Sequence, residues 1–283
     1  MTPSNQKRAL ACAVKAARAV GKLMRQNLNA TKRINSKTQH DIKLELDVRS
    51  QKLIAQTLAS AFPRIAFIGE EGIIGDPESP ERWVVDPIDG TVNFTYGIPH
   101  ACISIALQTK MLRLDVQGSK LKGATSSEED YQTVVGVVYD PFCDEMWTAI
   151  LGQPARLNGN IIHVSRRPLL REAIVAIGFA KSRGSLETTL PYFNQLVRRV
   201  RKVRMMGAAA LAMTYVASGR FDAYIERGIR LWDIAAGGLI VECAGGEFWR
   251  APIKGEYAYR MITSNGLLRK KLEAIQPEPG ICV

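Results

Sequence analysis

Apolar residues recur at helical spacing through the first sixty residues of the chain. In residues 5–28 the apolar side chains share one stripe and basic side chains lie opposite, which is typical of an amphipathic helix. This stripe consists of Leu10, Val14, Ala17, Leu23 and Met24. After a polar stretch at 29–40, the spacing resumes from 42 to 61 and is ended by Phe62-Pro63. The chain is therefore expected to begin with a pair of helices.

Beyond Pro63 the pattern changes to short apolar runs between Gly, Pro and charged residues, which predict strands. These runs lie at 65–68, 83–85, 102–108, 133–139, 146–149 and, after a helix, 203–205. The polar residues 110–131 predict a surface excursion between two strands. Helical spacing returns at 186–200, at 208–218, from Asp233 to about Cys243 and near 267–275, the last after a strand-rich stretch. The order of helix pair, sheet, helices, sheet and helix indicates layered α/β or α+β packing.

Length and composition narrow the class of protein. A chain of 283 residues that is 46% hydrophobic and 23% charged is typical of a globular protein. We expect one domain over 1–283, with tightly joined subdomains at 1–180 and 181–283. No apolar run reaches the ~18 residues of a membrane span, and basic residues interrupt the N-terminal apolar positions, which argues against a signal peptide. These features predict a cytoplasmic protein without a membrane partner.

Several common sites are missing from the sequence. Five scattered cysteines without a C-x-x-C pair argue against a disulfide framework or a zinc ribbon. The sequence contains no P-loop, no G-x-G-x-x-G dinucleotide motif and no G-x-S-x-G nucleophile motif. Nucleotide-binding, dinucleotide-binding and serine-hydrolase functions therefore lose their usual support.

The net charge of +11 is concentrated in two segments. Residues 1–40 hold nine Lys or Arg and no acid, and residues 198–204 hold five more basic residues. The rest of the chain has 24 basic and 27 acidic residues. Such clusters can attract a nucleic acid or another polyanion. A solvated basic face explains them equally simply, and without interleaved aromatic residues we favour that interpretation.

Two aspartates directly follow an apolar strand in the segment 83–91. The segment Trp83–Thr91 carries Asp86 and Asp89 directly after a strand, and Pro87 and Gly90 can bend the chain so that both carboxylates face one point. The backbone N–H groups after Gly90 could hold a phosphate. Read alone, the same residues are also typical of a surface turn.

Two further acidic motifs favour a functional site over a surface turn. Glu70 and Glu71 end the strand at 65–68, and Asp233 begins a helix rich in small residues. Alone, the first could be a polar turn and the second a helix cap. Gathered together without a Lys partner, such carboxylates repel one another and call for cations, and Mg²⁺ prefers oxygen ligands. The acids therefore predict a metal site.

Three of these segments together resemble the signatures of the inositol monophosphatase family. They are Gly69-Glu70-Glu71, Asp86-Pro87-Ile88-Asp89-Gly90-Thr91 with Asn93-Phe94, and Trp232-Asp233-Ile234-Ala235-Ala236-Gly237. Supporting matches are Asp47, Leu157-Asn158-Gly159, Gly207-Ala208-Ala209-Ala210 and Asp222-Ala223-Tyr224-Ile225-Glu226. The resemblance covers about residues 5–275. It implies a layered α-β-α-β-α sandwich, the sugar-phosphatase fold, and a homodimer.

The resemblance also implies roles for individual residues. Glu70, Asp86 and the carbonyl of Ile88 would hold one Mg²⁺, while Asp86, Asp89 and Asp233 would hold a second. A third, weaker ion would lie near Glu70. Asp47 and Thr91 would orient and deprotonate the attacking water. The amides of Gly90 and Thr91 would bind the phosphate.

The substrate implied is a small phosphorylated polyol or sugar, such as inositol 1-phosphate, hydrolysed with lithium sensitivity. Gly207 and Ala209 match positions where the backbone approaches the ring, and Glu226 and Asp89 match positions that bind the substrate. Departures from the family pattern leave fructose 1,6-bisphosphate and 3′(2′),5′-bisphosphate nucleotides open as substrates. These departures are the segment 177–183, Arg230, which could bind a second phosphate, and the insert 110–131. An RNA-associated regulatory protein that uses the basic surface is the alternative from another class.

Overall fold

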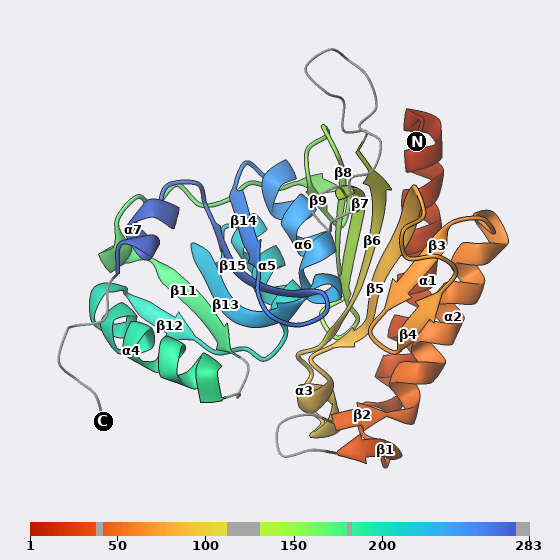
Figure 1. Cartoon of the computed structure of the whole chain (residues 1–283), viewed down its shortest axis with the longest axis horizontal. Coiled ribbons are helices and arrows are strands. Elements are labelled where there is room, and N and C mark those ends of the chain that lie inside the picture. The colour runs from red at the N-terminus through yellow and green to blue at the C-terminus, as the bar shows by residue number, and fades with distance from the viewer. Residues whose placement is uncertain (38–41, 112–130, 180–182, 276–283) are drawn as a thin grey trace.

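The computed structural model describes residues 1–37, 42–111, 131–179 and 183–275 (Figure 1). The predicted insert at 110–131 and the residues between 179 and 183 therefore lie almost wholly outside the described residues. The helices are α1 (Pro3–Asn27), α2 (Glu45–Ala61), α3 (Thr91–Thr95), α4 (Arg183–Arg199), α5 (Ala209–Ala217), α6 (Leu231–Cys243) and α7 (Arg269–Glu273). No helix in these ranges is long and apolar enough to cross a membrane.

The strands form one large sheet, one small sheet and a separate hairpin of β1 (Ile34–Lys37) and β2 (Ile42–Leu44). The large sheet contains, in chain order, β3 (Ala66–Gly69), β4 (Gly72–Ile74), β5 (Glu81–Asp89), β6 (Cys102–Lys110), β7 (Tyr131–Asp140), β8 (Glu145–Ile150), β9 (Arg156–Leu157) and β10 (Asn160–Ile161). Its spatial order is β10-β9-β8-β7-β6-β5-β3-β4. The small sheet contains β11 (Ile174–Phe179), β12 (Lys202–Arg204), β13 (Ala223–Arg230), β14 (Glu247–Pro252) and β15 (Ala258–Ser264), in the order β12-β11-β13-β15-β14.

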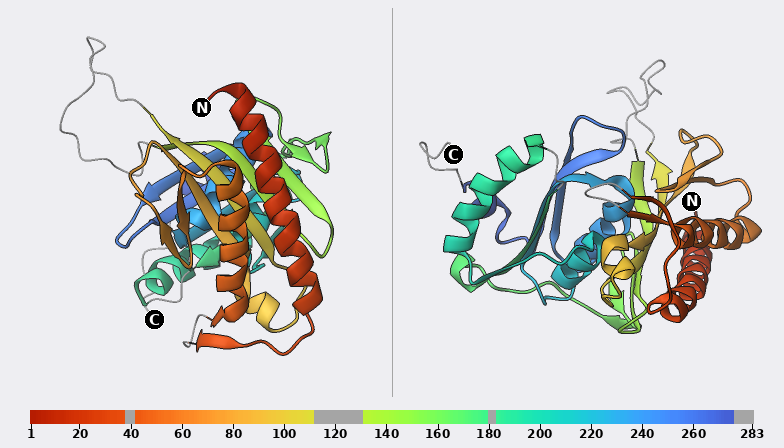
Figure 2. Two further views of the ribbon diagram at one scale, coloured as in Figure 1. Left: turned by 90° about the vertical axis from the view of Figure 1, so that its right-hand side faces the viewer. Right: turned by 90° about the horizontal axis from the view of Figure 1, so that it is seen from below.

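Helices cover the outer faces of both sheets and fill the space between them (Figures 1 and 2). The pair α1 and α2 packs on the large sheet, α5 and α6 lie between the sheets, and α4 and α7 cover the small sheet. A buried apolar cluster fills each of the three regions between helices and sheets. Because both faces of the large sheet are covered, its central strands β5 and β6 are buried almost throughout. The predicted α-β-α-β-α sandwich is confirmed.

Close packing of α6 on the large sheet depends on Gly136 of β7. A Cβ built on this glycine would lie 2.9 Å from the carbonyl oxygen of Ala236 in α6. The start of α6 is held as well, because the Ser104 hydroxyl of β6 donates to the carbonyl of Trp232 (3.0 Å). These contacts fix the position of Asp233 relative to the strands of the large sheet.

Several predicted boundaries are wrong. The second helix begins at Glu45, because residues 42–44 form β2 and pair with β1 in the stretch predicted as a polar break. The helix predicted to begin at Asp233 is α6, which begins at Leu231. β11 and β13 were not predicted as strands, because their pattern lacks a clear alternation of apolar and polar residues. β11 pairs with β12 and β13, so Ile174–Phe179 belongs to the same sheet as strands that follow residue 180. The division into subdomains at 180 stays a prediction.

Candidate active site

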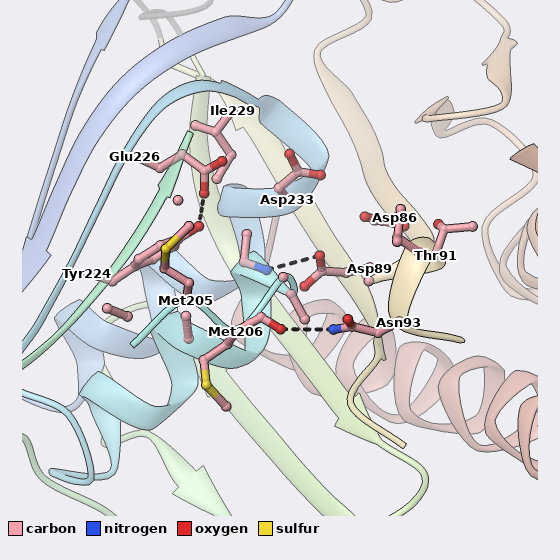
Figure 3. A pocket seen from close by; sticks show the side chains of 18 of the residues that line it. Asp86, Asp89, Thr91, Asn93, Met205, Met206, Tyr224, Glu226, Ile229 and Asp233 are labelled. Atoms are coloured by element: carbon pink, nitrogen blue, oxygen red, sulfur yellow. Dashed lines mark hydrogen bonds between the residues drawn. The ribbon is translucent and has the colours of Figure 1, made fainter. Parts of the chain in front are cut away.

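A cavity of about 450 Å³ brings nearly all of the predicted site residues together (Figure 3). Residues from β5, α3, α5 and α6 line it together with residues from β11 and β13 and with Glu70, which directly follows β3. The predicted residues in its wall are Glu70, Asp86, Ile88, Asp89, Gly90, Thr91, Gly207, Ala209, Glu226 and Asp233. Among the described lining residues there is no Lys, Arg or His. The described part of the cavity wall is therefore acidic and contains no basic side chain to balance its charge.

A β-bulge in β5 places its two aspartates on the same side of the strand. Asp86 lies opposite Ser104 and Asp89 opposite Cys102, so three residue steps on β5 face two on β6. Residues three apart on a regular strand point to opposite faces, and the extra residue of a bulge cancels this alternation. Asp86 is 2% exposed and Asp89 is 7% exposed, which excludes a surface turn.

Hydrogen bonds hold both aspartates in place. Asp86 Oδ1 accepts from the backbone N–H of Ile88 (2.9 Å). Asp89 accepts from the N–H groups of Ala209 (3.0 Å) and Ala210 (2.7 Å), the first residues of α5. The amide of Ala209 is therefore engaged by Asp89, although Ala209 does line the cavity as predicted. Asp89 satisfies N–H groups that would otherwise lack a partner at the start of a helix.

Glu70 follows β3 directly and is held beside β5. Its backbone N–H donates to the carbonyl of Val85 (3.2 Å). The neighbouring amide of Glu71 donates to Gln51 Oε1 (2.9 Å), and Gln51 lies on α2. A Cβ on Gly69 would lie 2.1 Å from the same oxygen, so the glycine leaves room for this contact. Gln51 was not identified from the sequence, since it belongs to none of the acidic motifs.

Asp233 reaches the cavity from a different element, the first turn of α6. Its Oδ2 accepts from the backbone N–H of Arg230 (2.9 Å), so it also fulfils the helix-capping role considered from the sequence. Figure 3 shows Asp233 on the same side of the cavity as Asp86 and Asp89.

Burial raises the pKa of every carboxylate in this group. The pKa of Glu70 rises to about 8, because of burial and the nearby charges of Asp233, Glu71 and Asp47. Burial and the charge of Asp89 raise the pKa of Asp233 to about 7. Burial raises the pKa of Asp89 to about 6 against the lowering effect of the α5 amides. Asp86 has a pKa well above its usual range, through burial and the charges of Glu70, Asp89 and Asp233. The cavity therefore favours cations or protons.

The two predicted water-activating residues lie in different surroundings. Thr91 lines the cavity, and its hydroxyl donates to the carbonyl of Ile88 (2.9 Å). Asp47 is on the first turn of α2, is only 2% exposed and accepts from the N–H of Leu44 (2.8 Å). It is thus no surface acid, but it is not among the described residues that line the cavity.

The wall opposite the aspartates contains residues that sequence reasoning did not assign. Met205, Met206, Tyr224 and Ile229 lie there beside Glu226 (Figure 3). The Asn93 amide joins the two walls by donating to the carbonyls of Met206 (2.8 Å) and His100 (2.9 Å). Only Tyr224, which is part of the Asp222–Glu226 motif, stood in a segment that the sequence singled out.

Arg230 does not point to the cavity as a second-phosphate site would require. Its guanidinium donates to the carbonyl of Glu256 (2.6 Å), and Arg230 is not among the described lining residues.

Comparison with known proteins places the chain in a family. The sequence profile of the inositol monophosphatase family matches residues 5–112 and 128–275. The chain belongs to the inositol monophosphatase family. The family prediction is thereby confirmed, and with it the class of enzyme, a phosphoric monoester hydrolase.

Relatives in this family are similar over almost their whole length. Inositol monophosphatase 1 of Solanum lycopersicum is 36% identical over 278 residues, which cover 94% of each chain. The Nus factor SuhB of Xylella fastidiosa is 35% identical over 259 residues, which cover 90% of this chain and 86% of the relative. The crystal structure of the extragenic suppressor protein suhB of Bartonella henselae matches with a TM-score of 0.80 and 31% identity, over 96% of this chain and 98% of that one.

The raised pKa values predict an unusual pH dependence of stability in the absence of metal. A carboxyl whose pKa is higher in the folded state stabilises the fold below its unfolded pKa, and this contribution is lost as the pH rises through the folded pKa. Values of about 6, 7 and 8 for Asp89, Asp233 and Glu70 place the loss between about pH 4 and pH 9. Thermal unfolding in a chelator should therefore show a midpoint that falls from about pH 5.5 to about pH 8.5.

Two variants test the origin of this decline. Asp86→Asn should flatten it, because one of the repelling charges is removed. Glu273→Gln, which changes a solvent-accessible acid on α7, should leave it unchanged. A midpoint that rises steadily with pH in the wild type would contradict the electrostatic description.

Proposed function

We propose that this protein hydrolyses a phosphate monoester of a small polyol or sugar, such as inositol 1-phosphate, with Mg²⁺ as cofactor. Family membership supports the reaction class. The observation that supports the rest is the single cavity in which Glu70, Asp86, Asp89 and Asp233 meet without a basic residue in the described lining. We further propose that the protein acts in the cytoplasm as a homodimer.

The oxygen atoms that line the cavity are of the kind that binds Mg²⁺. Carboxylate and carbonyl oxygens are the ligands that this ion prefers. Glu70, Asp86 and the Ile88 carbonyl would hold one ion, and Asp86, Asp89 and Asp233 a second, with a weaker third near Glu70. Four carboxylates would balance two divalent ions, which removes the repulsion that raises their pKa values. In the described part of the chain no group of three or more His, Cys, Asp or Glu side chains has the geometry of a preformed metal site.

When bound, Mg²⁺ supplies electrostatic stabilisation of the attacking and leaving oxygens of an in-line displacement. The residues of the chain would position the other reactants. The Thr91 hydroxyl donates to the Ile88 carbonyl. The lone pairs of the Thr91 oxygen therefore remain to accept a hydrogen bond from the attacking water. Asp47 would then act with Thr91 as the base. The N–H groups of Gly90 and Thr91 would bind the phosphate, since Gly90 adopts a positive φ of 92° that turns the chain at the start of α3.

The cavity favours a monophosphate over the alternative bisphosphate substrates. A second phosphate calls for Arg or Lys, and the described lining contains neither. Arg230 is engaged by the carbonyl of Glu256. Glu226 lines the wall where the remainder of the substrate would lie. Its carboxylate accepts hydrogen bonds from hydroxyl groups but repels a phosphate. Fructose 1,6-bisphosphate and 3′(2′),5′-bisphosphate nucleotides therefore fit this wall less well.

Asp86→Asn should abolish turnover while preserving the fold. The substitution removes the proposed shared ligand, so kcat should fall by more than about 100-fold, which is the upper range for loss of an outer contact in a metal site. Steady-state rates on inositol 1-phosphate in saturating Mg²⁺, together with circular dichroism, measure both effects. Near wild-type turnover would contradict the assignment, and Glu273→Gln is the matched control.

Mg²⁺ should activate at low concentration and inhibit at high concentration, and Li⁺ should inhibit. The proposed third ion is weak, and an excess of metal would hold it in place and slow phosphate release. Initial rates over a wide range of Mg²⁺, with and without Li⁺, test this. Rates that stay constant at high Mg²⁺ and ignore Li⁺ would argue against the proposed site.

A second candidate function is association with nucleic acid. Its support is the basic cluster at 198–204, together with relatives that carry the name Nus factor SuhB. Arg198, Arg199, Arg201, Lys202 and Arg204 are all exposed. They lie at the end of α4, on β12 and between the two, at the opposite side of the molecule from the basic helix α1 (Figure 1).

We expect this association to be weak. A filter-binding titration at physiological salt should show no complex tighter than the non-specific range of ~10⁻⁴–10⁻⁶ M. With ~4–6 phosphate contacts, the slope of log K against log salt should be near −3 to −5. Replacing Arg198, Arg199 and Arg201 with Ser should weaken binding without changing kcat, and the same change at Lys7, Lys15 and Lys22 of α1 tests the other cluster. A nanomolar, sequence-dependent complex would instead favour the regulatory function.

A further inference from the structure

Tyr224 and Glu226 form a hydrogen-bonded pair in the wall opposite the aspartates. They are two residues apart on β13, so both side chains point to the same face, into the cavity. The Tyr224 hydroxyl donates to Glu226 Oε2, as Figure 3 shows. Tyr224 is only 4% exposed, so this hydroxyl is held by the surrounding structure rather than by solvent.

The neighbouring strand β11 leaves room for this pair. Ala176 lies opposite Tyr224 and Gly178 lies opposite Glu226 in the parallel register of the two strands. A Cβ built on Gly178 would be 2.2 Å from Glu226 Oε2 and 2.6 Å from its Cδ. The carboxylate therefore lies against Gly178 on one side and Tyr224 on the other, which restricts its orientation.

This arrangement leaves two acceptors facing the cavity. Glu226 Oε2 accepts the hydrogen bond from the Tyr224 hydroxyl, so Oε1 remains to accept one from a substrate hydroxyl. A phenolic oxygen that donates its proton still has lone pairs with which it can accept one. Met205 and Ile229 line the same wall and offer apolar contact to the carbon atoms of a ring.

We infer that Tyr224 determines substrate specificity, because with Glu226 it accepts hydrogen bonds from two neighbouring hydroxyls of the alcohol part of the substrate. The ligand class is a cyclic polyol with a vicinal diol, carried by a phosphate monoester. This inference rests on the proposed phosphatase function. A site built to accept hydrogen bonds rejects analogues that lack the hydroxyls, because its buried polar groups then lose their partners.

Two phosphate esters of the same ring size test the inference. Myo-inositol 1-phosphate carries the hydroxyls, and cyclohexyl phosphate lacks them. In Tyr224→Phe, the ratio of kcat/KM for the inositol ester to that for the cyclohexyl ester should fall about tenfold, mainly through a higher KM, which corresponds to ~1.4 kcal/mol. Gly178→Ala should lower the same ratio, because the added methyl displaces the Glu226 carboxylate without removing either polar group.

The control is Tyr192→Phe, which removes a comparable hydrogen bond outside the site. The Tyr192 hydroxyl donates to the carbonyl of Leu272 (3.1 Å), between α4 and α7. This variant should keep the wild-type ratio. In a Glu226→Gln background, adding Tyr224→Phe should cause much less than a further tenfold loss, because residues that act as one unit are not additive.

If Tyr224→Phe lowered kcat/KM equally on both esters, Tyr224 would only support the fold. If it changed kcat/KM on neither ester, Tyr224 would have no part in specificity. Either result overturns the inference. Calorimetric Kd values for myo-inositol 1-phosphate test it independently of turnover. Binding should weaken about tenfold in Tyr224→Phe and stay unchanged in Tyr192→Phe, and equal Kd values in all proteins would overturn it. Failure of the wild type to hydrolyse either ester with Mg²⁺ would instead refute the proposed function.

Discussion

Carboxylates from β5, the end of β3 and the start of α6 share one largely buried cavity, and their mutual repulsion is the constraint that the surrounding structure must withstand. Raising the pKa of Asp89 from 3.8 to about 6 means that ionising it costs on the order of 3 kcal/mol more than in water. This is a large share of the ~5–15 kcal/mol by which domains are usually stable. The fold holds the acids together nonetheless, through the α5 amides, the bulge in β5 and the contacts at the start of α6.

The two sheets supply different halves of the cavity. The large sheet carries Glu70, Asp86 and Asp89, whose oxygens suit cations and phosphate chemistry. The small sheet carries Glu226 and Tyr224, whose oxygens suit hydroxyl groups. Asn93 joins the two halves by binding the Met206 carbonyl, and α6 lies between them. The two sheets therefore line one cavity with side chains of different chemistry.

Basic residues in the first forty positions make contacts that stabilise the fold locally. Arg8 donates to the Ala61 carbonyl and lies over the ring of Phe62. Arg25 donates to the Tyr139 hydroxyl and to the Pro141 carbonyl. These contacts join α1 to α2 and to the large sheet, so a run of basic residues does not by itself indicate a surface for polyanions.

The sequence by itself determined the family, because the acidic motifs are short local features of the chain, and the layer order followed from the resemblance to that family. Helical spacing and short apolar runs indicated only a layered packing of helices and strands. The sequence also identified the acids of the cavity, since three short motifs carry them. It missed β11 and β13, whose residues follow no clear period, and it missed Gln51 and Tyr224, whose roles depend on partners in other segments. Only the tertiary structure decided that Gly178 lies beside Glu226, that Arg230 turns to Glu256, and that Ala209 binds Asp89. These contacts join residues on separate strands, turns and helices, and their geometry is set by packing and strand register rather than by spacing along the chain.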